Sequence, residues 1–238
     1  MQPDPTELIK QINLQTPLIG TYDAPDISLF TPLVTPSVAK SACVFAFYKS
    51  WLQGKTLHLT EHNYGCGGCG HWFFGVINRS HDDYITFLVD EEGLKSSHQL
   101  MDKWLNAITP YTPQYNNILI GPLRQNQYEY LKTVTFYVNP DQLSLLILGA
   151  HYNNAPDDPA PVLTPFGSGC GEILPLFSNL DIPQAIVGAT DIAMRQYLPP
   201  DILAFTVTKP LFKQLCELDR KSFLYKPFWK NLKKARGL

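Results

Sequence analysis

The sequence predicts an α+β fold: a single domain over residues 1–238, with a mixed β-sheet and flanking helices. Three observations support this prediction. Short apolar segments typical of buried strands recur along the chain, separated by helical patterns. Two strand-like segments are each followed by a proline that opens a helix. No Gly/Ser-rich linker or run of charge divides the chain.

The first half alternates between helical and extended patterns. Apolar spacing predicts a short helix over residues 5–14 and a second helix over 35–54, which carries Cys43 and ends at Gly54. Strands are expected over 17–22 and over 55–62, where the chain runs into a cysteine-rich turn. A further strand is expected over 84–90, followed by an amphipathic helix over 94–108 that Pro110 stops.

The second half has the clearest organisation. A strand is predicted over 116–120, and residues 132–152 predict a strand followed by a helix that opens at Asn139-Pro140. A strand and a polar stretch are predicted over residues 183–198. A second strand follows over 202–218, with a helix that begins at Pro210. The two strand–proline–helix units are consistent with an internal duplication, although proline at a helix start is common enough for two unrelated junctions. Between them, residues 155–173 predict a long ordered loop, and such loops are often functional.

Composition limits the class of function. The chain has 238 residues and a net charge of −2, so no global field attracts nucleic acid. The basic segment 226–238 is typical of a solvated end, the alternative being a weak anionic contact. The N-terminal segment lacks a signal-peptide pattern, and no apolar run approaches the ~20 residues of a membrane helix. We therefore expect a cytoplasmic protein with no nucleic-acid or membrane partner.

The segment from Tyr64 to Trp72 concentrates the chemistry. Cys66 and Cys69 have the spacing of a metal knuckle, and Gly67 and Gly68 let the backbone approach whatever is bound. The same spacing suits a redox pair whose reactive thiol lies at a helix start. The third interpretation is a glycine-rich turn with incidental thiols. His71 follows as a candidate ligand or proton carrier, whereas His58 and His62 are expected to be ordinary surface residues.

Five cysteines in a reducing compartment argue against a disulfide framework. Cys170 is a further candidate ligand because it is embedded in glycines, Gly167 and Gly169 among them. Cys43 is the next candidate, although a buried core role is equally compatible with its apolar surroundings. Cys216 fits the core pattern of a helix and is excluded. The four remaining thiols, Cys43, Cys66, Cys69 and Cys170, would suffice for an iron–sulfur cluster or a zinc ion.

Other motifs are absent from the sequence: there is no Walker loop, dinucleotide-binding glycine motif, zinc-protease motif or nucleophile elbow. Asp191 and Arg195 are four residues apart, and an ion pair on a helix is favoured over binding of a polar ligand.

The order of the segments resembles a known family. A cysteine-bearing helix is followed by "GKTLHLT" and then by a Cys/Gly turn. After the turn come "FYVNPDQLSLLI", "PFGSGC" and "GATDIAMRQYLPPDILAFTVTKPLF". This order is similar to that of the domain of unknown function 169 family of bacterial and archaeal proteins, over nearly the whole chain. The resemblance implies a single intracellular domain and assigns no reaction.

Three functions remain open. The first is a metal- or iron–sulfur-binding protein with a redox or sensing role and a redox partner. The second is a small-molecule-binding protein or thiol-dependent enzyme, with a pocket between the two cysteine-bearing glycine segments. The third is an interaction protein without chemistry of its own. For the first two, the glycine segments around Cys69 and Cys170 are expected to meet in space.

Overall fold

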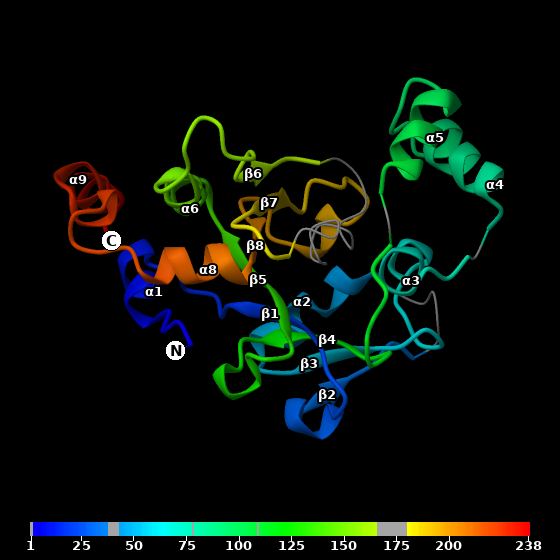
Figure 1. The fold of residues 1–238 in the computed structure, drawn as a ribbon, viewed down its shortest axis with the longest axis horizontal. Helices are drawn as coiled ribbons and strands as arrows, with labels where there is room; N and C mark the ends of the chain where they lie inside the picture. The colour runs from blue at the N-terminus through cyan, green and yellow to red at the C-terminus, as the bar shows by residue number, and fades with distance from the viewer. Residues whose placement is uncertain (1, 38–42, 78, 109, 166–179) are drawn as a thin grey trace.

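The fold is organised around one mixed β-sheet. The computed structural model describes residues 2–37, 43–77, 79–108, 110–165 and 180–238. The strands of these residues lie in the spatial order β2-β3-β4-β1-β5-β8-β7-β6 (Figure 1). Their bounds are β1 Ile19–Asp23, β2 Leu33–Val34, β3 Thr56–Leu59, β4 Ile118–Pro122, β5 Leu131–Val138, β6 Val162–Leu163, β7 Ala185–Gly188 and β8 Leu203–Thr208.

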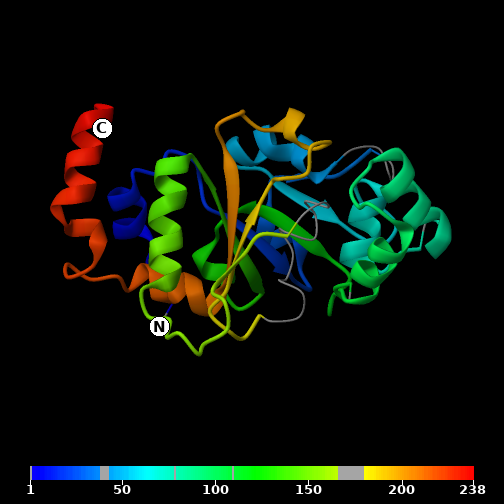
Figure 2. The same cartoon turned by 90° about the horizontal axis from the view of Figure 1, so that it is seen from above.

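Helices cover both faces of the sheet, which makes the domain α+β as the sequence predicts (Figure 2). One face packs against α1 (Thr6–Ile12), α6 (Pro140–His151), α8 (Lys209–Cys216) and α9 (Pro227–Arg236). The other face packs against α2 (Tyr48–Leu52), α3 (Gly67–Phe74), α4 (His81–Thr86) and α5 (His98–Asn106). Shorter helical segments are η1 Ile27–Phe30, η2 Val44–Phe47, η3 Phe87–Glu91, η4 Gln125–Gln127, η6 Arg195–Tyr197 and η7 Phe223–Tyr225.

The strand order is symmetric about the β1–β5 pair. On both sides of this pair two antiparallel pairings are followed by a parallel pairing at the edge. The registers agree as well: Val34, Leu57, Ile120 and Thr21 form one row, and Leu163, Ile186, Thr206 and Thr135 form the matching row. The strands β1–β4 and β5–β8 are therefore two copies of one unit.

A pseudo-twofold axis passes between the two units. Gly20 pairs with Val134, while the flanking pairs Ile19–Thr135 and Thr21–Thr133 exchange places under the rotation. The sheet edges repeat the relation, because the Thr56 N–H donates to the Pro32 carbonyl at 2.9 Å and the Ala185 N–H to the Pro161 carbonyl at 2.8 Å. The sequences of these edges, "PLVTP" at 32–36 and "PVLTP" at 161–165, match too.

The two strand–proline–helix units are present where the sequence predicts them. Pro140 begins α6 and Pro210 lies in the first turn of α8, and the preceding strands β5 and β8 are antiparallel neighbours. Asn139 and Gln142 form a reciprocal capping box at the start of α6. The repeat in the sheet differs from the duplication expected of these two units, because the counterpart of β5 is β1 and the counterpart of β8 is β4.

One expected strand is helical. Residues 84–90 carry β-branched and aromatic residues, yet they lie in α4 and the π-helical segment η3. The Ser80 side chain accepts a hydrogen bond from the Asp83 N–H at 3.1 Å, and two aspartates occupy the first turn. This N-cap starts a helix just upstream, so the local signal outweighs the strand propensity.

The two units differ most in one connection. Between β3 and β4 the chain runs through residues 60–117 and forms α3, α4, η3 and α5. Between β7 and β8 the equivalent connection spans only residues 189–202 and contains η6. Because the pseudo-twofold rotation reverses strand direction, the two connections leave opposite ends of the sheet, and residues of both pack on the same face. No helix of the described ranges combines the length and apolar character needed to cross a membrane.

Candidate functional site: a thiol-lined pocket

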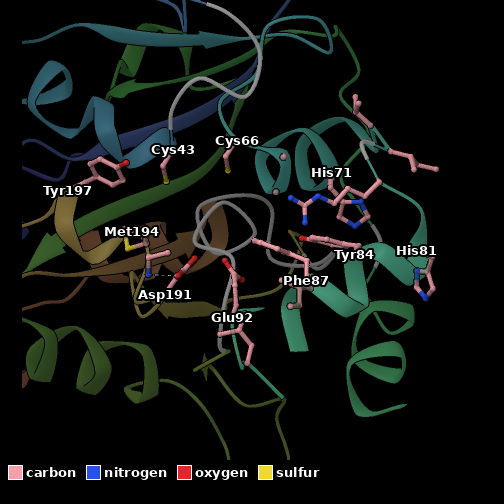
Figure 3. Close-up of a pocket in the computed structure, with 18 of the residues that line it drawn as sticks. Cys43, Cys66, His71, His81, Tyr84, Phe87, Glu92, Asp191, Met194 and Tyr197 are labelled. Carbon is pink, nitrogen blue, oxygen red and sulfur yellow. Dashed lines mark hydrogen bonds between the residues drawn. The ribbon is translucent and has the colours of Figure 1, made fainter. Parts of the chain in front are cut away.

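A pocket of about 550 Å³ lies between the two equivalent connections (Figure 3). Residues from α3, α4 and η3 form one wall, and residues 191–197 form the facing wall. The volume falls within the range of small-molecule sites, about 300–1,000 Å³. Apolar side chains supply much of the lining, namely Val76, Tyr84, Phe87, Leu88, Leu94 and Met194.

Cys66 lies in the pocket at the start of α3. It is the N-cap residue of this helix, and its sulfur accepts a hydrogen bond from the Cys69 N–H at 3.4 Å. The glycine-rich sequence favours a turn, but tertiary packing stabilises a helix here. The Tyr64 ring covers Gly70 so closely that a Cβ on that residue would lie 2.7 Å from the ring. The helix N-terminus and the N–H donor favour negative charge on the Cys66 sulfur.

Cys43 lies beside Cys66, although the two residues come from different parts of the chain. It is the N-cap of η2, and both sulfurs point into the same space (Figure 3). A hydrogen-bonding interaction with Cys66, together with burial, raises the pKa of the Cys43 thiol. The interaction favours a state in which Cys43 keeps its proton and Cys66 carries any negative charge.

The other described cysteines are not part of the pocket lining. Cys69 is fully buried among apolar side chains, and its backbone N–H donates a hydrogen bond to the Cys66 sulfur. Cys216 packs on the opposite face of the sheet, where burial raises its pKa to about 12. The expected core role of Cys216 agrees with this position. Cys170, Gly167 and Gly169 lie outside the described residues, so the meeting of the two glycine segments stays a prediction.

The remaining predicted residues of the turn line the pocket. Gly67 and Gly68 are the first two residues of α3 and face the cavity next to Cys66. His71 is one turn further on, with its ring 4.8 Å from that of Trp72 and 5.5 Å from that of Tyr84, measured between centroids. Burial, with a smaller effect from His81, lowers the pKa of His71 and favours its neutral form.

Two charged groups of the pocket were not predicted from the sequence. The Arg79 guanidinium lies 4.1 Å from the centre of the Phe87 ring, and Glu92 reaches the cavity from the end of η3 (Figure 3). Burial and the charge of Asp191 raise the pKa of Glu92. Both residues flank the segment expected to be a strand. The N-cap signal at Ser80 would have placed them on helical connections instead.

Asp191 and Arg195 do not share a helix as expected. Asp191 lies in a turn before η6, where its carboxylate accepts the Ala193 N–H at 2.9 Å and faces the pocket. The Arg195 guanidinium donates to the carbonyls of Ala189, Pro199, Pro200 and Ile202. Arg195 therefore holds the β7–β8 connection in shape, which positions Asp191 and Met194.

Aromatic side chains support the pocket from the sheet side. Tyr137 of β5 is fully buried, and its ring lies 6.0 Å from Trp51 and 4.9 Å from Tyr48, measured between centroids. Burial raises the pKa of Tyr137 far above its usual value, with added effects from Tyr48 and Cys43. The buried, uncharged Tyr137 ring therefore belongs to the apolar surroundings of Cys43.

The pocket region does not hold a complete metal site within the described residues. Among the residues that the structure describes, no group of three or more His, Cys, Asp or Glu side chains is placed to hold a metal ion. Cys43 and Cys66 alone are too few for the four-coordinate geometry of structural zinc. A zinc or iron–sulfur site would need ligands outside the described ranges.

The fold and site define an α+β protein with a ligand-sized, thiol-lined pocket between two repeated units. The sequence profile of the domain of unknown function 169 family, described as "Uncharacterised ArCR", matches residues 7–217. The chain belongs to this family, as the resemblance of its segments indicates. No match was found among curated proteins or among solved structures.

Proposed function

We propose that this protein binds a small organic molecule in the pocket and acts on it through the Cys66 thiolate. The observation that carries the proposal is the placement of two thiols from distant parts of the chain in a cavity of about 550 Å³. Buried cysteines that only fill a core have no need of a cavity. A reactive cysteine needs access, nearby donors and positive potential.

Three features support Cys66 as the nucleophile. Its sulfur is at the N-terminus of α3, it accepts the Cys69 N–H, and it interacts with Cys43. Each favours the thiolate, which is the reactive form of cysteine. His71 supports a proton-transfer role, since the neutral form favoured by its lowered pKa can accept a proton.

The test compares alkylation of single cysteines. Native protein under reducing conditions is treated with iodoacetamide at neutral pH, and labelled peptides are quantified by mass spectrometry. Cys66 is expected to react at least about tenfold faster than Cys216, whose partly buried thiol packs against the core and has a raised pKa. Filling the pocket with a ligand found by thermal-shift screening should protect Cys66.

The matched control is Cys216→Ser, which should leave labelling of Cys66 unchanged. Cys66→Ser should abolish the fast phase while keeping the thermal midpoint close to that of the native chain. Equal labelling of Cys66 and Cys216 in folded protein would contradict the proposed nucleophile.

A metal centre is the second candidate function, with a redox or sensing role. The adjacent thiols of Cys43 and Cys66, with Cys69 one turn away, favour it over an interaction protein without chemistry. The cofactor would be an iron–sulfur cluster or zinc, with Cys170 as the fourth ligand. Such a centre would make the pocket an access route for an electron-transfer partner.

Purification without oxygen separates the two candidates. The metal candidate predicts bound iron and sulfide, or zinc, at up to one site per chain. Cys66→Ser and Cys170→Ser should each lower this content, and Cys216→Ser should lower it little. Folded, colourless protein that lacks iron and zinc after such a preparation would exclude the metal centre and leave the small-molecule pocket.

A further inference from the structure

We propose that Cys43 and Cys66 form a redox dithiol that reduces small organic disulfides bound in the pocket. The inference rests on the proposed function, because it uses the same pocket and the same nucleophile. It adds the reaction type, the resolving thiol and the substrate class.

The resolving partner of Cys66 is Cys43, which is distant in sequence, and not Cys69 of the Cys-x-x-Cys pair. Cys43 and Cys66 both line the pocket, with their sulfurs pointing to one region (Figure 3). Cys69 is fully buried, and its part in the contact is a backbone N–H. A resolving thiol must reach the Cys66 sulfur in line with the bond that breaks, on the side away from the substrate sulfur. Cys43 shares the pocket with Cys66 and is placed for this approach, whereas Cys69 is buried.

The protonation pattern divides the roles. The Cys66 sulfur lies at the start of α3 and accepts the Cys69 N–H, which favours negative charge there. The interaction with Cys66 and burial raise the pKa of Cys43, so Cys43 keeps its proton in the resting pair. Once Cys66 is bonded to a substrate sulfur, it carries no charge, and one cause of the raised pKa of Cys43 disappears. Cys43 is thereby released to act second.

The reaction balances within one turnover. The Cys66 thiolate attacks one sulfur of a disulfide R–S–S–R′, forms a mixed disulfide Cys66–S–R and expels R′–S⁻. Cys43 then attacks the Cys66 sulfur, forms the Cys43–Cys66 disulfide and expels R–S⁻. The proton of Cys43 and one proton from solvent, equal to the one that Cys66 lost on ionising, go to the expelled thiolates. The protein loses two electrons, the substrate gains them, and a low-molecular-weight thiol restores the dithiol by the reverse exchange.

The lining of the pocket selects the substrate class. Phe87, Leu88, Leu94 and Met194 face the cavity beside the two thiols, so an apolar or aromatic group on sulfur is favoured. Large, highly charged disulfides such as oxidised glutathione would have to desolvate several charges to enter. The favoured substrates are compact disulfides with aromatic or branched aliphatic groups.

The experiment treats reduced protein, free of oxygen, with dipyridyl disulfide. Released thiopyridone is followed by absorbance, and the intact mass of the protein is measured. The native chain and Cys216→Ser should release two equivalents quickly and keep no adduct. Cys43→Ser and Cys43→Ala should release one equivalent quickly and keep a pyridylthio adduct on Cys66. Cys66→Ser should lose the fast phase, by about tenfold or more in rate.

Oxidised glutathione serves as the comparison substrate. The rate of the protein with each disulfide is divided by the rate of free cysteine with the same disulfide. The proposal expects the aromatic disulfide to be favoured by about tenfold or more, since apolar contacts form only in the pocket. Peptide mapping should find Cys43 linked to Cys66. A lasting adduct on the native chain, or a link from Cys66 to Cys69 or Cys170, would overturn the dithiol.

The outcomes separate this inference from the proposed function. If Cys66 alkylates rapidly but the native chain keeps its adduct, the dithiol is wrong and the nucleophilic pocket stands. If Cys66 reacts no faster than Cys216 with either reagent, the proposed function fails and the inference fails with it. Circular dichroism of each variant distinguishes loss of reaction from loss of fold.

Discussion

The two four-stranded units share one framework and differ in what they carry. The β3–β4 connection of the first unit holds α3, α4 and α5, whereas the β7–β8 connection of the second holds only η6. Yet the pocket uses both, with Cys66 and Arg79 on one side and Asp191 and Met194 on the other. The comparison teaches that a symmetric scaffold can place an elaborated and a simple connection face to face, so that a cavity forms between them.

Equivalent positions in the two units carry different residues, and these residues have different structural roles. Asp23 of β1 corresponds to Tyr137 of β5, and Gly20 corresponds to Val134. Asp23 anchors the chain that returns from α5 to β4, and Tyr137 packs behind Cys43. Substitutions at these paired positions are therefore expected to differ most in how much stability they remove.

Replacing Asp23 should cause the largest loss of stability. Its buried carboxylate accepts the Tyr111 hydroxyl at 2.6 Å and the N–H groups of Gln114 and Tyr115 at 2.7 and 3.0 Å. Asp23→Ala leaves these donors without an acceptor, and we expect a loss of about 3 kcal/mol in the free energy of unfolding, measured in urea.

The matched control is Tyr137→Phe at the equivalent position of the second unit. The Tyr137 hydroxyl is buried and has no hydrogen-bond partner among the described residues, so its removal should change stability by less than about 0.5 kcal/mol or stabilise slightly. Equal effects of the two substitutions would show that the units have not diverged in this way.

Gly20→Val should have the next largest effect. A Cβ at Gly20 would lie 2.5 Å from the Tyr22 hydroxyl oxygen, which accepts the Arg124 N–H at 2.6 Å. The second unit carries Val134 at the equivalent position, so only the first unit needs glycine. We expect a loss of about 2 kcal/mol from displacing the Tyr22 ring, measured by thermal unfolding.

A control for this substitution is Gly67→Ala, where a Cβ would meet nothing within 4 Å. This change should leave the thermal midpoint unchanged or raise it slightly, because alanine favours helix over glycine. A Gly20→Val midpoint equal to that of the native chain would refute the close approach of Tyr22.

The smallest effect is expected from His71. Its folded-state pKa is lowered by burial and by His81, so below about pH 6.5 the unfolded chain binds this proton more readily. The contribution of His71 to stability is therefore intact above about pH 6.5 and declines as the pH falls through that value. Urea midpoints measured between about pH 5 and 8 should show this slope.

His71→Phe keeps the ring packing against Trp72 and Tyr84 and should flatten that part of the pH profile. The exposed His151 offers the control, since His151→Gln should leave the slope as it is. A slope unchanged by His71→Phe would assign the pH dependence to other groups.

Much of the sheet could be predicted from periodicity alone. β1, β4, β5, β7 and β8 lie where apolar segments predict strands, because burial on both faces leaves a local signature. Residues 84–90 misled the prediction, since their strand propensity is local and the Ser80 cap comes before the segment. The pseudo-twofold axis was not predicted, because it is defined mainly by strand order and register. The matching segments "PLVTP" and "PVLTP" at the sheet edges are too short to reveal it alone.

The site was predictable only in part. The glycine-rich Cys-x-x-Cys segment predicted Cys66, Gly67 and Gly68 as site residues, and all three line the pocket. Cys-x-x-Cys spacing fixes the separation of Cys66 and Cys69 along the chain, but helix geometry decides which sulfur faces the cavity. Arg79 and Glu92 have no motif, and their proximity arises from the packing of connections distant in sequence.

The central β1–β5 pairing also determines what happens if the chain is divided. A break between β4 and β5 would leave each fragment with an open β-strand edge, along β1 in one and β5 in the other. Exposed edges of this kind bind any complementary strand within reach. Each fragment could then pair its open edge with the other fragment or with a second copy of itself, because the same strand register allows both pairings. Such a sheet has the form of a joined homodimer, and its covalent connection ensures that unlike halves meet.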